Sequence, residues 1–213
     1  TVTAELRYDG NGERREVRFY PSVIRSDERL TYTWVKKILV DGDTELRQKF
    51  SPLLPSLNLM ADLCRELRRR RDERGSIDFD LPEPEVILNL QGETKDIIRA
   101  ERNLAHQIIE EFMIAANEAV AQFMEERGFP FVYRIHEPPK KEAIDEFRRF
   151  ISQLGYKMKK ETDHSPKELQ KVLSDVKGRP EERVVNEILL RSMKWAKYSA
   201  KNLGHFGLAS DGY

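Results

Sequence analysis

Residues 102–123 read RNLAHQIIEEFMIAANEAVAQF, and they form the clearest helical pattern in this sequence. Apolar side chains recur every three or four positions, as expected for an α-helix that turns about 100° per residue. We predict a helix from Asn103 to about Arg127, ended by Gly128. Two adjacent glutamates, Glu110 and Glu111, interrupt the apolar run. The direction in which each of them faces is the first question that this stretch raises.

A helical projection predicts that the two glutamates face different ways. Glu111 belongs to a set of glutamates spaced by sevens, which is typical of a stripe that faces solvent. Glu110 lies roughly 100° from Glu111, in a polar seam with His106 and Asn117. We expect Glu110 to be half-buried, and a half-buried carboxylate needs a partner. Glu110 therefore either makes a structural hydrogen bond to a loop or an arginine, or lines a cleft; Asn117 either binds a ligand or caps a loop.

The composition is that of a charge-rich protein that can still bury a core. Of 213 residues, 39% are hydrophobic and 35% are charged, and the net charge is zero. A zero net charge gives no global field that attracts nucleic acid, so any anion site must come from local clustering. The single cysteine, Cys64, excludes an internal disulfide framework and a Cys-rich zinc site, and we expect it to be a buried thiol. No run approaches the roughly 20 apolar residues of a membrane span, so we predict a cytoplasmic protein without a membrane partner.

The segments before the quoted helix predict hairpins and two further helices. The turn DGNG at 9–12 indicates a hairpin. Asp41 and Asp43 flank a turn glycine, and we expect this acidic pair to be solvated. Thr31 is a plausible N-cap, and Gly75 a plausible helix end. The expected elements are strands at 2–8 and 15–24, helices at 29–39 and 53–74, a short strand at 76–81 and a hairpin at 85–101.

The segments after it are mostly helical. We expect a buried strand at 129–136, followed by helices at 139–155, 165–178 and 179–200, with Ser165 as a cap. The fold class is therefore α+β (mixed α/β). We expect one domain over residues 1–213, rich in β-hairpins to about residue 101 and in helices from 102 onward. Because the chain starts without Met and ends after a strand-like run, we expect it to be a piece of a longer protein.

Several stretches together resemble the catalytic RNB domain of the ribonuclease R and ribonuclease II family of exoribonucleases. They occur in the family's order and cover nearly all of the chain. They are SVIRSDERLTYTWV at 22–35, ERGSIDFDLPE at 73–83, RNLAHQIIEEFMIAANEAVAQF at 102–123, VYRIHEPP at 132–139 and ILLRSMKWAKYSAKNLGHFGLASDGY at 188–213. The resemblance implies a partial RNB domain, with flanking catalytic segments at both ends outside this chain.

The resemblance implies hydrolysis of single-stranded RNA from its 3′ end to nucleoside 5′-monophosphates, with two Mg²⁺ ions held by aspartates. Those aspartates would lie before the first strand, and a phosphate-contacting arginine would follow Tyr213. We therefore expect the isolated chain to bind no metal and to be inactive, and the pair Asp78 and Asp80 to be solvated surface. The parent is expected to be a monomer, whereas exposed sheet edges of the fragment can pair with another copy. The alternatives are a non-catalytic module that binds single-stranded RNA, and a helical interaction domain.

The resemblance also assigns site residues. Glu110 matches a glutamate beside the 3′-terminal nucleotide, as an auxiliary catalytic residue that positions it. The helical projection favours Glu110 for this role, and the adjacent Glu111 is the alternative if the helix phase differs. Phe79 matches an aromatic residue that stacks on a terminal base, although its alternation with Ile77 and Leu81 also fits a core residue. His205, between glycines in GHFGLA, is expected to lie in the RNA channel.

Further RNA-binding candidates come from the strand at 129–136 and from the last helix. Arg134 and His136 alternate on one strand face, where a core histidine and a salt-bridged arginine are the alternative. Arg191, Lys194 and Tyr198 have helical spacings of three and four, which fits either a phosphate-and-base track or an ordinary helix surface. The basic run RELRRRRDERG at 65–75 is expected to be a solvated helix face, or else to guide RNA to a channel.

Overall fold

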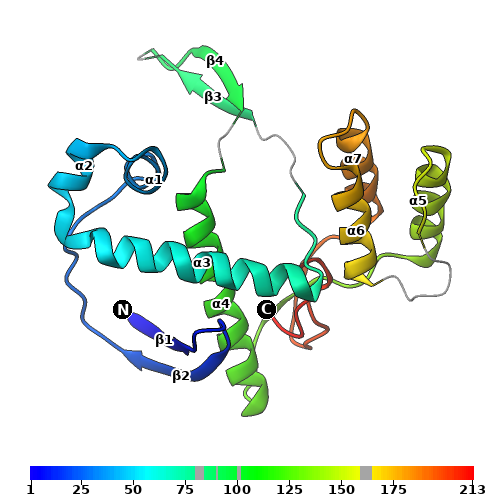
Figure 1. Cartoon of the computed structure of the whole chain (residues 1–213). Coiled ribbons are helices and arrows are strands. Elements are labelled where there is room, and N and C mark those ends of the chain that lie inside the picture. Colours follow the sequence, from blue (N-terminus) through cyan, green and yellow to red (C-terminus); the bar gives the residue numbers. More distant parts are fainter. Residues whose placement is uncertain (80–83, 90, 100–101, 159–164) are drawn as a thin grey trace. The chain divides into compact units, whose positions relative to one another are not determined.

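The computed structural model describes residues 1–79, 84–89, 91–99, 102–158 and 165–213, which form two compact units (Figure 1). The first unit contains Thr1–Arg71 and Arg102–Phe129, and the second contains Asp72–Glu101 and Pro130–Tyr213. Helices and short antiparallel strand pairs alternate along the chain, which confirms the predicted α+β class. The prediction of one domain over 1–213 stays a prediction.

The first unit begins with the predicted hairpin of β1 (Val2–Tyr8) and β2 (Arg14–Pro21). The side chain of Asp9 accepts hydrogen bonds from the amides of Asn11 and Glu13, both at 2.9 Å, and so closes the turn. The strand expected to continue to residue 24 ends instead at Pro21. Proline has no amide hydrogen to donate to a ladder, which favours a strand end there.

The helices of the first unit follow, and one of the two side-chain caps described here was predicted from the sequence. Thr31 accepts a hydrogen bond from the amide of Trp34 and caps the first helix, as predicted. Asp43, expected to be solvated, instead accepts from the amide of Leu46 and caps the second. The elements are α1 (Tyr32–Lys36), the π-helical turn η1 (Lys37–Asp41), α2 (Thr44–Lys49), the 3₁₀ turn η2 (Ser51–Leu53), α3 (Leu54–Arg74) and α4 (Leu104–Glu126).

The long helices α3 and α4 cross and pack against each other (Figure 1). Their buried contact includes Ala61 and Cys64 from α3 and Ile108 from α4. Small side chains at a crossing let two helices approach closely. The apolar surface between the two helices is then removed from water, which stabilises their contact. The buried free thiol of Cys64 confirms that prediction. The side chain of Asn103 caps α4, which confirms the predicted start of that helix.

The strand expected at 76–81 falls near the start of the second unit and is only partly described. Its described part, residues 76–79, has no regular structure, and Asp80 and Leu81 lie outside the described residues. The amide of Ile77 donates to the carbonyl oxygen of Gly207 at 2.8 Å, so this backbone bonds to a loop rather than to a neighbouring strand. The hairpin of β3 (Pro84–Leu88) and β4 (Thr94–Arg99) follows, as predicted.

The core of the second unit lies between three helices, α5 (Lys141–Gln153), α6 (Pro166–Val176) and α7 (Glu182–Ser192). Each helix buries apolar side chains at helical spacing, such as Ile144 and Phe147, Leu169 and Val172, and Val185 and Leu189. Ser165 accepts from the amide of Glu168 and caps α6, which confirms the predicted cap.

The helix expected at 179–200 ends early, at Ser192. The Ser192 hydroxyl donates to the carbonyl oxygen of Ile188, a local bond that competes with regular helix geometry. Residues beyond it form β6 (Lys197–Ser199), which pairs antiparallel with β5 (Tyr133–Ile135). The predicted strand at 129–136 is thus only three residues long, and a 3₁₀ turn, η3 (Phe206–Leu208), follows β6.

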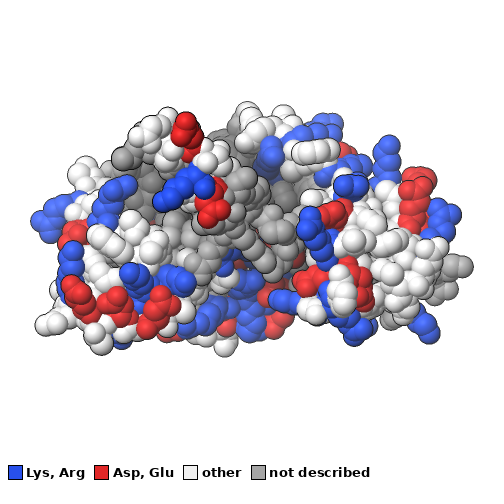
Figure 2. All heavy atoms as spheres, turned by 90° about the horizontal axis from the view of Figure 1, so that it is seen from above, with Lys and Arg blue, Asp and Glu red and all other residues white. Residues whose placement is uncertain are grey.

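The surface carries both signs of charge. Lys and Arg side chains are interspersed with Asp and Glu side chains on the face drawn in Figure 2, consistent with a net charge of zero. A ligand anion would therefore be attracted by particular residues rather than by a general field. Within the described residues, no helix combines the length and apolar character that crossing a lipid bilayer requires.

Candidate functional site

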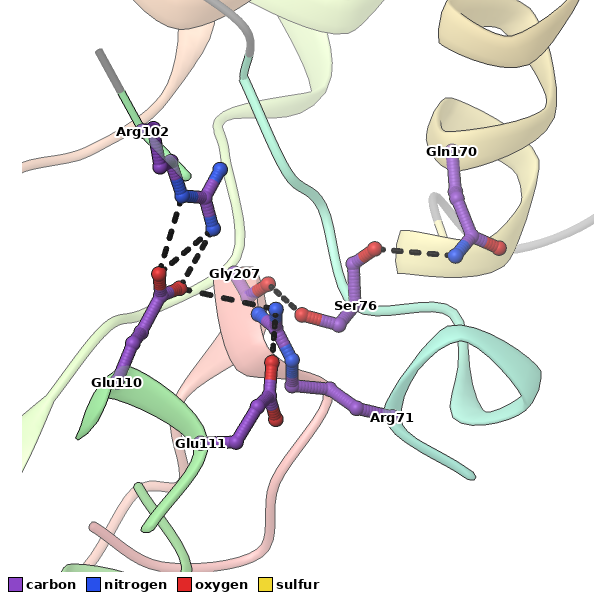
Figure 3. Close-up of polar contacts among 7 residues, drawn as sticks. All are labelled: Arg71, Ser76, Arg102, Glu110, Glu111, Gln170 and Gly207. Atoms are coloured by element: carbon purple, nitrogen blue, oxygen red, sulfur yellow. Dashed lines mark hydrogen bonds and ion pairs between the residues drawn. The ribbon is translucent and has the colours of Figure 1, made fainter. Parts of the chain in front are cut away.

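Glu111, and not Glu110, is the more deeply buried glutamate of the pair on α4. Its side chain is 3% exposed, and its Oε1 lies 2.7 Å from Nη2 of Arg71, which is 4% exposed (Figure 3). The prediction that Glu111 faces water is therefore wrong. The expectation that the basic run at 65–75 is a solvated helix face is also wrong at Arg71, because this side chain is buried against Glu111. A helical projection finds the arcs of a helix but not the arc on which a neighbouring helix packs.

Glu110 is half-buried, as predicted, with 29% of its side chain exposed. Arg102 binds it through both carboxylate oxygens, from Nη2 to Oε1 at 2.7 Å and from Nε to Oε2 at 3.1 Å (Figure 3). Arg71 lies farther off, with Nη2 3.7 Å from Oε1 of Glu110. The arginine partner fits the alternative in which Glu110 makes a structural hydrogen bond. The 29% of its side chain that is exposed still lets a ligand reach the carboxylate.

The two glutamates and the two arginines form a small charge-balanced network in the first unit. Burial raises the pKa of Glu111, and the adjacent Arg71 guanidinium opposes that rise. Burial also raises the pKa of Cys64 to about 11, and the nearby Glu111 carboxylate adds to this effect. The network thus holds Glu110 at its outer end, where a carboxylate with a fixed orientation can accept hydrogen bonds.

The polar seam expected along α4 is only partly formed. His106 belongs to the helix cap, since its Nδ1 accepts from the amide of Asn103, and its ring stacks on Tyr32 at 4.1 Å between ring centroids. Asn117 is exposed and lies two turns from Glu110 along the helix. Of the seam residues, His106 therefore has a structural role, and Asn117 faces outward.

Phe79 lies in the irregular segment after Gly75, in the second unit. It is partly buried and packs against the core cluster of that unit, which includes Ile77. The packing gives a physical basis to the core alternative, but Phe79 as a residue is only partly buried. Both alternatives for Phe79 therefore stay open.

Arg134 and Tyr198 face each other across the β5–β6 pair. The guanidinium carbon of Arg134 lies 4.9 Å from the centroid of the Tyr198 ring, a cation–π contact, and Tyr198 is 70% exposed. The helical spacing assumed for Arg191, Lys194 and Tyr198 is wrong, because α7 ends at Ser192 and Tyr198 belongs to β6. A strand pair, rather than a helix face, places Tyr198 beside a cation.

The same strand region contains two features that the sequence analysis missed. Trp195 is 93% exposed, and its position between lysines in MKWAK was the available signal. Glu137 pairs with Lys194 at 3.8 Å and with Lys197 at 3.0 Å, which holds both ammonium groups near β6. The two lysines hold the pKa of Glu137 below its ordinary value. The region therefore combines exposed aromatic rings with fixed cations.

His136 and His205 lie together, with their ring centroids 5.1 Å apart. His136 Nδ1 accepts from the amide of Gly207, and His205 Nδ1 accepts from the amide of Leu208, each at 3.2 Å. Burial lowers the pKa of His136, and burial together with the neighbouring His136 lowers the pKa of His205 to about 4. Both rings are thus neutral near pH 7 and bind the backbone.

The described residues do not fit the magnesium site that the family resemblance implies. Among residues 1–79, 84–89, 91–99, 102–158 and 165–213, no group of three or more His, Cys, Asp or Glu side chains lies close enough together to hold a metal ion. The carboxylates of Glu110 and Glu111 are instead paired with arginines. No catalytic step through a metal is derived from these residues.

The chain matches the RNB domain family over residues 1–213, and it belongs to that family. Among curated proteins it is similar to ribonuclease R of Aquifex aeolicus, with 47% identity over 211 residues, 99% of this chain and 30% of that protein. Ribonuclease R of Escherichia coli is 38% identical over 212 residues, 100% of this chain and 26% of that protein. The chain thus spans 30% or less of the length of these two relatives.

Solved structures agree with the family. The apo form of Mycoplasma genitalium RNase R matches with a TM-score of 0.89 and 25% identity, over 100% of this chain and 33% of that one. The same enzyme in complex with ribose-methylated single-stranded RNA matches with the same TM-score, identity and coverage. Yeast Ssd1, described as a pseudonuclease, matches with a TM-score of 0.68 and 18% identity, over 100% of this chain and 26% of that one, and so shares the fold alone.

Proposed function

We propose that this chain is part of a 3′-to-5′ exoribonuclease that hydrolyses single-stranded RNA to nucleoside 5′-monophosphates. The observation that carries the proposal is the match of the RNB domain family to all 213 residues. Relatives named ribonuclease R and the RNA-bound form of the Mycoplasma genitalium enzyme support it. The proposal gives this chain the task of holding the RNA, and not the hydrolysis itself.

The magnesium-dependent chemistry is assigned, within this proposal, to carboxylates outside these 213 residues. Two considerations support this assignment: the described side chains do not gather into a metal site, and the chain spans at most 30% of the relatives cited. The isolated chain is then expected to be inactive. Magnesium-dependent release of nucleotides by a pure sample of residues 1–213 would contradict this assignment.

Glu110 is proposed to position the 3′-terminal nucleotide as an auxiliary residue. A carboxylate accepts hydrogen bonds, and the ribose 2′- and 3′-hydroxyls of a terminal nucleotide are donors, of which the 2′-hydroxyl distinguishes RNA from DNA. The bonds from Arg102 hold the carboxylate in one orientation and leave 29% of the side chain exposed. Pre-oriented acceptors lose less conformational entropy when a ligand binds.

The remaining candidates are proposed to contact RNA along its length. The partly buried Phe79 is proposed to stack on a base, an interaction worth about 1–3 kcal/mol that tolerates any sequence. The exposed Tyr198 ring, with Arg134 on it, offers a second stacking surface beside a cation. Arg191, Lys194 and Asn117 are proposed as further polar contacts. His136 and His205 are proposed to lie in the RNA channel that the family resemblance implies.

The test uses 5′-labelled single-stranded RNA, Mg²⁺ and the full-length protein that contains this chain. A ladder that shortens from the 3′ end, with release of nucleoside 5′-monophosphates, is the expected result. Glu110→Ala should change the rate or the length of the final product, whereas Glu125→Ala, an exposed glutamate on the same helix, should change neither. If Glu110→Ala unfolds the protein instead, the structural role of Glu110 is favoured.

The second candidate is a non-catalytic module that grips single-stranded RNA. The likeness in fold to yeast Ssd1, described as a pseudonuclease, favours keeping it. This candidate predicts salt-sensitive RNA binding by the full-length protein with no shortening of the RNA at any magnesium concentration. The ladder experiment separates the two, because only the exoribonuclease yields mononucleotides.

A further inference from the structure

Gly207 joins three segments that lie far apart in the sequence of the second unit. Its amide donates to Nδ1 of His136 at 3.2 Å. Its carbonyl oxygen accepts from the amide of Ile77 at 2.8 Å. The same oxygen accepts from the hydroxyl of Ser76 at 3.2 Å (Figure 3). One peptide backbone at position 207 therefore connects a histidine on one side to the segment that precedes Phe79 on the other.

The contact between Gly207 and His136 leaves no room for a Cβ atom at position 207 unless a neighbouring group moves. A Cβ atom on Gly207 would lie 2.9 Å from Nδ1 and 3.3 Å from Cε1 of His136. Carbon and nitrogen atoms do not normally approach to 2.9 Å without a hydrogen bond, so the ring or the loop would have to shift. The absence of a side chain at Gly207 lets the backbone of this loop approach the Nδ1 edge of the imidazole.

The backbone of His136 holds the same loop independently of its side chain. Its amide donates to the carbonyl oxygen of Gly204 at 3.0 Å, and its own carbonyl oxygen accepts from the amide of Phe206 at 2.8 Å. Both bonds use backbone atoms of residue 136, so every substitution except proline keeps the groups that form them. The backbone of His136 therefore attaches the loop, and its imidazole orients the Gly207 amide.

The imidazole must be neutral to make this bond, because a protonated Nδ1 cannot accept. Burial lowers the pKa of His136, in agreement with that requirement. The accepting Nδ1 assigns the remaining proton to Nε2. The tautomer of His136 is thus set by the Gly207 amide and is open to direct measurement.

The segment that Gly207 holds leads directly to Phe79. Ser76 and Ile77 are buried, and Gln170 on α6 donates to the carbonyl oxygen of Ser76 at 3.1 Å. With Ile77 bonded through its amide and buried through its side chain, the backbone two residues before Phe79 has little freedom. The orientation of the Phe79 ring follows from where this anchored backbone directs it.

We propose that His136 is a positioning residue for Phe79, the side chain proposed to stack on a base. Through Gly207, His136 fixes the segment of Ser76 and Ile77 and thereby the ring of Phe79, without itself touching RNA. The inference rests on the proposed function, because it matters for RNA only if Phe79 stacks on a base. It changes the role of His136 from a direct RNA contact to a support for another residue.

Two substitutions separate the imidazole's hydrogen bond from its bulk. In His136→Asn, the amide oxygen stands close to the place of Nδ1 and can accept from Gly207; in His136→Leu, the side chain is of similar size but cannot accept. With the 213-residue chain ¹³C-labelled at phenylalanine, His136→Leu should shift the Phe79 ring resonances, and His136→Asn should leave them near their original positions. Unshifted Phe79 resonances in His136→Leu would overturn the inference, whatever RNA binding shows.

RNA binding then tests the functional part, with a fluorescein-labelled 12-nucleotide oligoadenylate as the probe. Phe79→Ala should weaken binding about 5- to 150-fold. His136→Leu should weaken it by a similar factor, and the double variant should bind no more weakly than Phe79→Ala alone. Additive losses would instead assign His136 a direct contact with RNA. Unchanged binding by Phe79→Ala would overturn the proposed role of Phe79 while leaving the NMR result on His136 standing.

A measurement on the unmodified chain covers the case in which His136→Leu does not fold. Two-bond ¹H–¹⁵N spectra of the histidine rings should show His136 as the neutral Nε2–H tautomer, and the Gly207 and Ile77 amides should exchange slowly with solvent. A protonated Nδ1, or rapid exchange at both amides, would overturn the inference without any variant.

Discussion

At the residue scale, the Arg71–Glu111 pair shows how one buried charge depends on another. Both side chains are almost fully buried, and their closest atoms are 2.7 Å apart. Two charges removed from water lose hydration, and their mutual attraction only partly offsets that loss. The pair is therefore better understood as mutually dependent than as strongly stabilising.

This dependence predicts an asymmetry between single and double substitutions. Arg71→Met should lower the free energy of unfolding by about 3–5 kcal/mol, because it leaves Glu111 buried without its closest cation. Arg71→Met combined with Glu111→Leu should recover most of that loss, since two apolar side chains fill the space without charge. Urea unfolding of the variants measures both values.

The control for this prediction lies on the same helix. Arg69 pairs with Glu66 at the surface, so Arg69→Met should cost about 0–1 kcal/mol. A double variant as unstable as Arg71→Met alone would mean that the site needs its charges. In that case the charges of Arg71 and Glu111 would have a role beyond the support of Glu110.

At the element scale, the start of α4 depends on a reciprocal cap. The side chain of Asn103 accepts from the amides of Ala105 and His106, and His106 accepts from the amide of Asn103. Asn103→Ala should destabilise the chain by about 1 kcal/mol, as measured by thermal or urea unfolding. Met113→Ala, at an exposed position in the interior of the same helix, should change stability much less, because Met and Ala both favour helices. Equal effects of the two substitutions would contradict a role of the cap.

The 3₁₀ turn η3 predicts a dependence of stability on pH. Its N-cap, His205, accepts from the amide of Leu208, and its pKa falls from 6.5 to about 4 in the folded chain. The unfolded chain therefore binds more protons between these values, so stability is complete above pH 6.5 and is lost as the pH falls toward 4. Unfolding in urea at pH 7.0 and 4.5 should show the loss. His205→Asn, which keeps an acceptor but does not titrate, should reduce it.

At the scale of the whole chain, the balance of charge predicts how RNA binding depends on salt. Because the net charge is zero, affinity for RNA should come from a few local contacts with phosphates. A plot of the logarithm of the binding constant against the logarithm of salt concentration should then fall with a slope of about 0.7 for each phosphate contact. Arg134→Gln should weaken binding and reduce that slope by about 0.7. Fluorescence anisotropy across a salt series measures the slope.

The matched control for the salt series is Arg7→Gln. Arg7 is an exposed arginine on β1 that pairs with Glu5 and Glu16, so its removal should leave both the affinity and the slope unchanged. An absence of RNA binding even at low salt would favour the helical interaction domain instead.

The sequence by itself determined the class of fold, the caps and the family. Helix starts at Thr31, Asn103 and Ser165 were predictable because a capping side chain bonds to amides only two or three residues away. The family was recognisable because its stretches occur in order along the chain, and residues 1–213 match the RNB domain. Such signals need only neighbouring residues or their order.

Only the tertiary structure decided which side of a helix is buried and where the last helix ends. Glu111 is buried because α3 packs on that side of α4 and brings Arg71 to it. Tyr198 lies on a strand because β5 is available to pair with it, although its spacing from Lys194 suits a helix. Likewise, the segment before Phe79 bonds to Gly207 rather than to a strand. In each case the deciding partner is distant in the sequence, so no local pattern contains it.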